Sequence, residues 1–434
     1  MLSKADNLKM CQTDAGTPMG EAMRRFWIPV LPSEYLEADG APRRVELLGE
    51  TFVAFRNTAG EVGILDEQCC HRSASLVLGR VEDCGIRCLF HGWKFAIDGT
   101  IMETPNVSDP RFKTRFRAKS YPIREAGGFI WTYIGEKGTE PEFKRWPYFD
   151  VAPDHRLTVS FVVDDCNFVQ LGEALLDSSH LTILHQDIFK RTSDSPLAVN
   201  VSNASVSADP RMEVDETEFG LHYAAIREVP TEDGPQAEAR VTSFFAPFYY
   251  LNANGNMIGM IIPMTDTRTL HHFVWWDDEK PLANDPYRAD LLGFAGLTDA
   301  MLRQIGVHHE NWQEPGKPSR ANNFHQDRVA MKQGSFSGLP VFFPEDHAML
   351  VSSGAIRDRS KEILAPADLA IARLYRVLLR LADTVARGEE PRCLHVDPMD
   401  IRGMHALIED GKGWRDLVPA HVPFGRDNAP RVPA

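Results

Sequence analysis

The sequence predicts an α+β protein in which a small all-β domain precedes a larger domain that mixes strands and helices. Residues 43–133 contain short strand-like runs such as RRVELLGETFVAFRN and GGFIWTYIG, separated by turns rich in Gly, Asn and Asp. The later part alternates strand-like runs with segments of helical periodicity. The length of 434 residues suits two or three domains, and 43% hydrophobic with 25% charged residues is an ordinary globular composition.

Three segments follow from these patterns. Residues 1–40 form an N-terminal helical segment, in which Thr17 can cap a short helix that has Pro18 in its first turn. Residues 41–145 form the all-β domain, and residues 146–434 form the second domain. The stretch KGTEPEFKRWPYFDVAPDH, with its prolines between aromatic residues, predicts the connection between the two.

The second domain contains both kinds of element. LTVSFVVDD, ARVTSFFAPFYYLN, MIGMIIPM and LHHFVWWD are typical of strands, whereas residues 167–185 and 285–306 have the periodicity of helices. Residues 368–388 predict a long amphipathic helix that Asp368 can cap at its start and Gly388 at its end. The apolar face of this helix comprises Ile371, Leu374, Leu378, Leu381 and Val385.

Charge and cysteine content narrow the class of protein. The formal net charge of −14 disfavours nucleic acid and anionic membranes as main partners, because both would be repelled. The N-terminus lacks the apolar core of a signal peptide and no long apolar run occurs, so we expect a cytoplasmic protein that does not span a membrane. The seven cysteines are odd in number and partly clustered, which favours a metal site in a reducing compartment over a disulfide framework.

The clearest chemical signal lies in CCHRSASLVLGRVEDCGIRCLFHGWKF, residues 69–95. Cys69 and His71 form a C-x-H pair, and Cys88 and His91 form a C-x-x-H pair. Two thiolates and two imidazoles suit either a tetrahedral zinc ion or an iron-sulfur cluster. In a Rieske [2Fe-2S] centre two cysteines bind one iron and two histidines bind the other. Each loop must then contribute one cysteine and one histidine in the same order, which is the order found here.

The same stretch resembles the Rieske domains of ring-hydroxylating oxygenases, including the HR after the first pair, the GIRC before the second and the HGW that contains His91. The resemblance implies a [2Fe-2S] cluster that accepts and passes on electrons. Cys70 and Cys84 depart from the family pattern, which usually has proline and glycine at these positions. We interpret both as small buried side chains. The ligands implied by the resemblance are Cys69, His71, Cys88 and His91.

A second candidate centre lies in NFVQLGEALLDSSHLTILH, which contains a D-x-x-H-x4-H pattern. Asp177 and His180 would share one face of a helix, whereas His180 and His185 would lie about 140° apart on a regular helix. Both histidines can reach one ion only if the helix ends, kinks or takes a π-bulge between them. Spacing alone therefore leaves ordinary core or capping histidines as an alternative.

Downstream of a Rieske pattern, D-x-x-H-x4-H resembles the oxygenase α-subunit of these systems. The resemblance implies a helix-grip catalytic domain, an antiparallel sheet with helices, in which His180 and His185 bind a mononuclear non-haem Fe(II). It also implies that Asp177 bridges a Rieske histidine of one subunit to an iron-binding histidine of its neighbour. A carboxylate in this position would orient the imidazole and tune its basicity.

The third iron ligand is expected among the carboxylates of residues 322–362. Asp327, Glu345, Asp346 and Asp358 are all candidates. The segment GAIRDRSKE and the helix after it resemble the phthalate 4,5-dioxygenase branch, in which the ligand aspartate lies shortly before the DRS triplet. This resemblance selects Asp346, with Asp327 as the alternative. Asp327 and Asp358 could instead belong to turns or pair with a neighbouring arginine.

The resemblance also implies the reaction. The chain would be the terminal oxygenase component that uses O2 and NAD(P)H-derived electrons to hydroxylate, in the main reading dihydroxylate, an aromatic carboxylate such as a phthalate or a substituted benzoate. No G-x-G-x-x-G follows a strand and no second cysteine set occurs, so we infer a separate reductase that uses flavin or ferredoxin. The family assembles as homotrimers or stacked trimers.

Arg227 and Arg240 lie on probable strands and are candidates for binding the substrate carboxylate, with structural ion pairs as the alternative. Two other functions remain open. One is an O-demethylase or monooxygenase of a methoxylated aromatic acid, because the outcome depends on which substrate carbon faces the iron. The other is a non-catalytic electron-transfer or zinc-binding protein.

Overall fold

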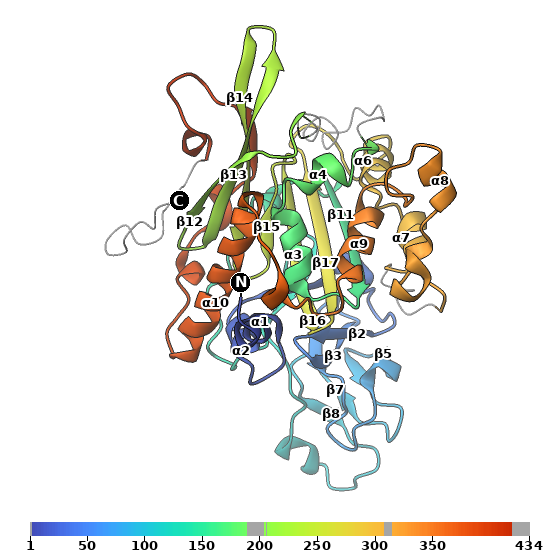
Figure 1. The fold of residues 1–434 in the computed structure, drawn as a ribbon. Coiled ribbons are helices and arrows are strands. Elements are labelled where there is room, and N and C mark those ends of the chain that lie inside the picture. Colours follow the sequence, from blue (N-terminus) through green and yellow to red (C-terminus); the bar gives the residue numbers. More distant parts are fainter. Residues whose placement is uncertain (1, 189–203, 205, 308–314, 419–434) are drawn as a thin grey trace. The chain divides into compact units, whose positions relative to one another are not determined.

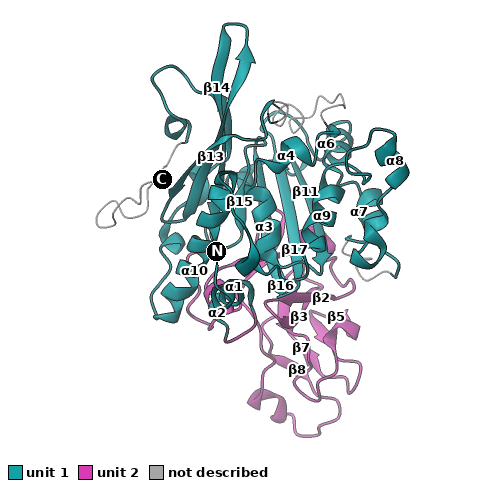
Figure 2. Cartoon of the chain, viewed as in Figure 1, with its two compact units in different colours: residues 1–13, 17–19, 144–434 teal, residues 14–16, 20–143 magenta. Residues whose placement is uncertain are grey.

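The computed structural model describes residues 2–188, 204, 206–307 and 315–418. The chain divides into two compact units, coloured separately in Figure 2. The larger unit comprises residues 1–13, 17–19 and 144–434, and the smaller unit comprises residues 14–16 and 20–143. Among the described helices, none combines the length and the apolar character needed to cross a lipid bilayer.

The smaller unit is built of three antiparallel sheets, which confirms the predicted all-β domain. Their orders are β1-β10-β9, β2-β3-β4 and β5-β6-β7-β8. Alternate residues Val53 and Phe55 of β3 point into a common core with Leu65 of β4 and Phe95 of β7. The strand bounds are β1 (Ile28–Pro32), β2 (Arg43–Leu47), β3 (Glu50–Arg56), β4 (Val62–Asp66), β5 (Arg80–Glu82), β6 (Gly85–Arg87), β7 (Lys94–Phe95), β8 (Ile101–Glu103), β9 (Ile123–Ala126) and β10 (Phe129–Thr132).

The larger unit contains an eight-stranded antiparallel sheet within its described residues. The strand order is β11-β17-β16-β15-β14-β13-β12, and β18 pairs with β14. Three of the four predicted strand segments of this unit are single strands, whereas ARVTSFFAPFYYLN comprises the end of β14 and all of β15; the β-branched and aromatic residues of these segments suit a largely buried pleated surface. The bounds are β11 (Arg156–Asp164), β12 (Arg211–Glu216), β13 (Gly220–Thr231), β14 (Gly234–Phe245), β15 (Tyr249–Leu251), β16 (Met257–Thr265), β17 (Arg268–Trp276) and β18 (Met404–Leu407).

Helices cover this sheet, as Figure 1 shows. Helix α3 packs on β15 and β16 with α9 beside it, and α10 packs on β12 and β13. All five apolar residues predicted for the inner face of α10 are buried. The helix bounds are α1 (Lys4–Cys11), α2 (Pro18–Met23), α3 (Phe168–Leu176), α4 (His180–Ile183), α6 (Tyr287–Ala295), α7 (Asp299–Ile305), α8 (Arg328–Lys332), α9 (Phe343–Ser352) and α10 (Leu369–Ala386).

One predicted helix is two helices. The segment 285–306 breaks at Gly296, which has φ +72° and ends α6 in the left-handed conformation that glycine adopts without steric cost. Thr298 then caps α7, where its side chain accepts a hydrogen bond from the Met301 N–H. Periodicity across the break continues, so the sequence pattern alone does not reveal the turn.

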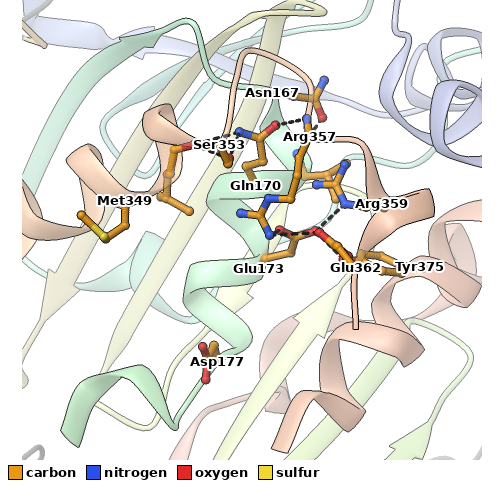
Figure 3. Close-up of polar contacts among 12 residues, drawn as sticks. Asn167, Gln170, Glu173, Asp177, Met349, Ser353, Arg357, Arg359, Glu362 and Tyr375 are labelled. Atoms are coloured by element: carbon orange, nitrogen blue, oxygen red, sulfur yellow. Dashed lines mark hydrogen bonds and ion pairs between the residues drawn. The ribbon is translucent and has the colours of Figure 1, made fainter. Parts of the chain in front are cut away.

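Helix α3 is attached to α9 by a glutamine (Figure 3). The Gln170 amide donates to the carbonyl of Leu350 at 3.1 Å and to that of Gly354 at 3.0 Å. Its amide oxygen accepts a hydrogen bond from the Arg357 N–H at 2.9 Å. Because Gln170 is fully buried, these contacts fix the distance between α3 and the C-terminal end of α9.

A buried carboxylate one turn further along α3 makes a second attachment (Figure 3). Glu173 accepts a hydrogen bond from Arg359 Nε at 2.6 Å and from the Tyr375 hydroxyl at 2.8 Å. Arg357 Nη1 lies 3.0 Å from the other carboxylate oxygen. Burial alone would lower the pKa of Arg359, but Glu173 outweighs it and raises that pKa. Arg359 of the DRS triplet thus belongs to a buried ion network that joins α3 to α10.

Glu173→Gln should destabilise the larger unit by about 3 kcal/mol, because it leaves the fully buried Arg359 without its charged partner. The expected result is a lower midpoint in urea unfolding followed by far-UV circular dichroism. Glu389→Gln is the matched control, since Glu389 and its partner Arg387 are both more than half exposed. Equal midpoints for the two variants would contradict the stabilising role of the network.

Candidate active site

Two loops of the smaller unit carry the predicted cluster ligands. The first loop follows β4 and contains Cys69 and His71, and the second joins β6 to β7 and contains Cys88 and His91. In each loop the N–H four residues after the cysteine donates to the cysteine carbonyl, at 2.9 and 3.0 Å. Both loops are therefore tight turns that place their cysteine and histidine side by side.

The thiols and the imidazoles pair separately. Cys69 and Cys88 are each 2% exposed and lie within hydrogen-bonding reach of each other. The rings of His71 and His91 have centroids 4.6 Å apart, and Trp93 stacks on His71 with an angle of 3° between the planes. The buried Nδ1 of His91 has no hydrogen-bond partner among the described residues. This arrangement fits a [2Fe-2S] centre, in which one iron has two thiolate ligands and the other has two imidazole ligands.

The protonation of these groups agrees with a role as metal ligands. Burial, with a smaller contribution from Cys88, raises the pKa of the Cys69 thiol to about 12. Burial and the neighbouring His91 lower the pKa of His71. The histidine is therefore neutral, as ligation requires, whereas the thiolate form of Cys69 needs a cation beside it.

The prediction that Cys70 and Cys84 are buried is wrong, because both are exposed. Cys84 lies in the two-residue turn between β5 and β6, where Asp83 has φ +44° and Cys84 has φ +62°. Such a turn matches the twist of a hairpin and places its central side chains in solvent. Its positive φ also explains why glycine suits this position.

In the larger unit, the helix predicted over residues 167–185 is interrupted. Helix α3 ends at Leu176, and α4 is a single turn that starts at His180. Asp177 causes the break, because its Oδ1 accepts hydrogen bonds from the N–H and the hydroxyl of Ser179, both at 2.7 Å. His185 lies beyond the end of α4. The helix end between the two histidines, which one shared ion requires, is thus the end of α4 at Ile183.

The two histidines converge on one aspartate. His185 Nε2 lies 3.0 Å and His180 Nε2 lies 3.6 Å from Asp346 Oδ1. One ligand atom from each of the three residues lies within 4.8 Å of the others. The buried Nε2 of His185 makes no well-directed hydrogen bond among the described residues. Two imidazoles and one carboxylate in this arrangement are the donor set of a non-haem iron site with open coordination positions.

Without an ion, His185 and Asp346 hold each other in their charged forms, so a bound iron would take the place of the proton on His185 Nε2. Burial favours the neutral forms of His185 and Asp346, but their mutual contact outweighs it, so the pKa of His185 rises to about 9 and that of Asp346 falls. Burial likewise opposes ionisation of Asp177, yet contact with His180 holds its pKa below the usual range. The Asp177 Oδ2 lies 3.4 Å from His180 Nδ1, the nitrogen that faces away from Asp346.

The other candidate carboxylates have different contacts. Asp327 caps α8, where its Oδ1 accepts hydrogen bonds from two backbone N–H groups at 2.8 and 2.9 Å. Asp358 accepts hydrogen bonds from the N–H and the hydroxyl of Ser360. Glu345 contacts His185 at Nδ1, the nitrogen opposite the one that faces Asp346. The three-residue group His180, His185 and Asp346 therefore includes the carboxylate that the sequence selected.

A cavity of the larger unit reaches this group. It holds about 710 Å³ of space not occupied by protein atoms, part of it open to solvent. Asp177, His180 and Asp346 line one part of it. Most of the remaining wall is apolar and includes Leu175, Leu181, Met257, Phe273, Leu297 and Phe342.

Arg240 is a buried cation in the wall of this cavity. It is 5% exposed, and burial lowers its pKa to about 10, so it stays charged at neutral pH. Its Nη2 donates to Asn254 at 2.5 Å, whereas the buried Nη1 has no hydrogen-bond partner among the described residues. The indole N–H of Trp275, also in the wall, is likewise buried without a partner in the described chain. Two residues of the cavity wall therefore carry a buried donor without a partner in the described chain.

Arg227 does not line the cavity. Its Nε donates to the Ser207 carbonyl at 2.9 Å, and its two Nη atoms donate to the hydroxyl and the carbonyl of Ser178 at 3.2 and 3.1 Å. Because Ser178 lies between Asp177 and His180, the structure directs this arginine to the segment that connects α3 to α4. Each of its three guanidinium nitrogens thus donates to another residue of the chain.

Comparison with known proteins identifies the family. Residues 26–122 match the Rieske [2Fe-2S] domain, and residues 132–427 match the LigXa C-terminal domain like family. The chain is 35% identical to the phthalate 4,5-dioxygenase oxygenase subunit of Pseudomonas putida, over 97% of this chain and 96% of that protein. The 3-chlorobenzoate-3,4-dioxygenase oxygenase subunit of Comamonas testosteroni is also 35% identical, over 86% of this chain and 87% of that protein.

The chain belongs to the Rieske non-haem iron oxygenases.

The fold of this Rieske oxygenase recurs in solved structures of low identity. The QL mutant of NdmA from Pseudomonas putida CBB5, solved with theobromine, is 16% identical with a TM-score of 0.59, over 91% of this chain and 99% of that one. Dicamba monooxygenase bound to dicamba is 17% identical with a TM-score of 0.56, over 84% of this chain and 98% of that one. As a member of the family, this oxygenase subunit is an oxidoreductase with a [2Fe-2S] cluster and a mononuclear non-haem iron.

Sequence reasoning missed some residues of the site. Trp275 was recognised only as part of a strand, because nothing in LHHFVWWD distinguishes an indole in a cavity wall from one in the core. Glu345 was considered only as an iron ligand. The sequence signal that distinguishes the two roles is that Glu345 and Asp346 are adjacent at the start of α9. Successive side chains of a helix point about 100° apart, so two adjacent carboxylates do not easily serve as the same ligand.

Proposed function

We propose that this Rieske oxygenase hydroxylates an aromatic carboxylate, such as a phthalate or a substituted benzoate, with ring dihydroxylation as the main reaction. The observation that carries the proposal is Arg240, a buried residue in the wall of the cavity that also contains His180 and Asp346, whose Nη1 has no hydrogen-bond partner among the described residues. A guanidinium can bind a carboxylate through two parallel hydrogen bonds. A buried donor without a partner is costly unless a ligand supplies the acceptor.

The candidate residues would have distinct roles. His180, His185 and Asp346 would hold the iron, and Cys69, His71, Cys88 and His91 would hold the cluster. When bound, the cluster supplies electrons and the iron supplies a site for O2 activation. Arg240 and the Trp275 indole would anchor the carboxylate, while the apolar wall holds the aromatic ring and excludes water. Arg227 would position the segment around Ser178.

The partners follow from the same proposal. Relatives of the chain are named as oxygenase subunits of larger systems, which supports a separate NAD(P)H-dependent reductase with flavin or ferredoxin as the electron source. The protein would assemble as a homotrimer or as stacked trimers. In that assembly Asp177 would join His180 to a cluster histidine of a neighbouring subunit, and its side chain, 27% exposed, has the accessibility that such a contact needs.

The decisive experiment is a substrate screen. The iron-loaded protein and a compatible reductase are given phthalates, benzoates and methoxybenzoates, and O2 uptake is measured together with product analysis under 18O2. The expected result is O2 uptake that depends on the added aromatic acid, together with a cis-diol product that contains both 18O atoms. Formaldehyde release without a diol would replace dihydroxylation with O-demethylation. Turnover confined to uncharged aromatics would overturn the carboxylate assignment.

Arg240→Gln should lower kcat/KM for the carboxylate substrate by about 10- to 100-fold, because a hydrogen bond to a charged group contributes about 1.5–3 kcal/mol. The loss should be smaller for the corresponding methyl ester, so the preference of the enzyme for the acid should fall. Steady-state kinetics on acid and ester measure this ratio. Arg387→Gln is the control, since Arg387 pairs with Glu389 on the surface. An unchanged ratio in Arg240→Gln would remove Arg240 from carboxylate binding.

A further inference from the structure

Glu345 is a completely buried carboxylate beside the candidate iron site. It lies in the first turn of α9, directly before Asp346, and is 0% exposed. Since its side chain turns away from the point where His180, His185 and Asp346 converge, it does not belong to that group. A fully buried carboxylate without compensating hydrogen bonds would destabilise the folded protein, so the partners of Glu345 need to be identified.

Three donors surround this carboxylate. The Ser337 hydroxyl lies 2.6 Å from Oε1, and the Phe342 N–H donates to Oε2 at 3.0 Å. His185 Nδ1 lies 2.8 Å from Oε2. An ionised carboxylate only accepts hydrogen bonds, so this contact requires the proton of His185 to be on Nδ1. In the neutral imidazole the lone pair is then on Nε2, the atom that faces Asp346.

We propose that Glu345 is a positioning residue that fixes the tautomer and the ring orientation of His185 for iron binding. The inference rests on the proposed role of His180, His185 and Asp346 as iron ligands. Metal-binding histidines commonly donate their second N–H to a carboxylate, which orients the ring and raises its basicity as a ligand. Glu345 is placed to do this for His185 from the side opposite the iron.

The two histidines of the site differ in the carboxylate behind them. Asp177 stands 3.4 Å from His180 Nδ1 and keeps 27% of its side chain exposed. Glu345 stands 2.8 Å from His185 Nδ1 and has no exposed surface. Asp177 can therefore interact with a group outside the subunit, whereas Glu345 acts only within it. We assign the fixed orientation of the site to Glu345 and its external connection to Asp177.

Glu345 also connects the iron site to the cavity wall. Phe342, from whose N–H Glu345 accepts a hydrogen bond, has φ +66°, a backbone conformation that residues other than glycine rarely adopt. The Phe342 ring stacks on His185, with centroids 4.6 Å apart and 27° between the planes, and it lines the cavity. Glu345 thus contacts both the imidazole of His185 and the backbone of the residue whose ring stacks on that imidazole.

The test compares iron binding in Glu345→Gln with the wild type. Mononuclear iron is removed from the full-length protein with a chelator under anaerobic conditions while the [2Fe-2S] spectrum is monitored, and Fe(II) is then titrated back. We expect Fe(II) affinity to fall by about 10- to 100-fold, the usual effect of losing a partner of a metal-binding histidine. We also expect a changed electron paramagnetic resonance spectrum when nitric oxide is added as a probe, because a neutral amide oxygen is a weaker acceptor than a carboxylate and holds the His185 ring less firmly.

Two variants make the result specific. Asp327→Ala removes another helix-capping carboxylate of the same unit and should keep Fe(II) affinity and the nitric oxide spectrum. Ser337→Ala removes one donor to Glu345 but leaves its contact with His185, so its effect should be smaller than that of Glu345→Gln. If Asp327→Ala lowers Fe(II) affinity as much as Glu345→Gln does, the effect of Glu345→Gln comes from the loss of a helix cap and not from its contact with His185.

The outcomes separate the inference from the function beneath it. If Glu345→Gln keeps wild-type affinity and the wild-type nitric oxide spectrum while Asp346→Ala loses iron, the role of Glu345 is refuted and the iron site stands. If Asp346→Ala also keeps its iron, the ligand assignment itself fails. Should the Glu345→Gln protein lose its fold, Glu345→Asp decides through the same spectrum, because the shorter side chain draws the carboxylate away from His185 Nδ1 and an unchanged spectrum there would overturn the inference.

Discussion

Asp346→Ala is expected to lose the mononuclear iron while keeping the [2Fe-2S] cluster. Asp346 Oδ1 is the point on which His180 Nε2 and His185 Nε2 converge, at 3.6 and 3.0 Å, and it supplies the negative charge that the two imidazoles lack. Removal of a direct ligand should weaken Fe(II) binding by more than the roughly 100-fold upper range for an indirect partner. Product formation should fall to background.

The measurement is metal content with cluster absorbance as the internal reference. Iron and acid-labile sulfide are determined on the same sample, and the ratio should fall to that of a [2Fe-2S] cluster alone. Asp327→Ala is the control because Asp327 was the alternative ligand in the sequence and caps α8 in the structure. Iron retained in Asp346→Ala and lost in Asp327→Ala would reverse the assignment.

Asp177→Asn is expected to stop turnover while both metal centres remain. The asparagine keeps an Oδ1 that can accept the hydrogen bonds from Ser179, so the break between α3 and α4 should persist. What disappears is the negative charge 3.4 Å from His180 Nδ1. Loss of this charge should lower turnover by about 100-fold or more, the upper end for a group behind a metal ligand.

Single-turnover kinetics identify the step that fails. The protein is reduced, mixed with O2 and the carboxylate substrate, and the reoxidation of the cluster is followed by its absorbance. Asp177→Asn should show a wild-type cluster spectrum and wild-type iron content with slow reoxidation. Asp327→Asn, a neutralised cap elsewhere in the same unit, should reoxidise at the wild-type rate. Fast reoxidation in Asp177→Asn would remove Asp177 from the electron route.

Local patterns of the sequence were sufficient wherever spacing along the chain fixes geometry. The C-x-H and C-x-x-H pairs lie in tight turns, so residues two or three apart are necessarily neighbours in space. The buried face of α10 follows from its period of about 3.6 residues, because every member lies on one side of a regular helix. The predicted strands of both units follow from β-branched and aromatic runs, whereas strands such as β12 and β18 were not predicted.

Contacts between distant segments needed the tertiary structure. Arg227 and Arg240 lie on paired strands and look alike in the sequence, yet Arg240 reaches the cavity while Arg227 reaches Ser178. Cys84 was misplaced because exposure depends on the turn that carries it. The interruption at Asp177 was also missed, since side-chain capping by Asp and Ser competes with the helix only when the surrounding packing allows the chain to turn.

The choice of Asp346 as third ligand shows most clearly what the sequence predicts and what requires the tertiary structure. By itself the sequence determined the family and the α+β fold, and it supplied four candidate cluster ligands and two histidines with a neighbouring aspartate, because each of these is written within a short segment. It left four carboxylates for one position. Only the tertiary structure brought α9 beside α3 and so placed Asp346 on the Nε2 side of both histidines and Glu345 on the Nδ1 side of His185. Two adjacent acidic residues receive opposite sides of one imidazole because side chains of successive helical residues diverge by about 100°.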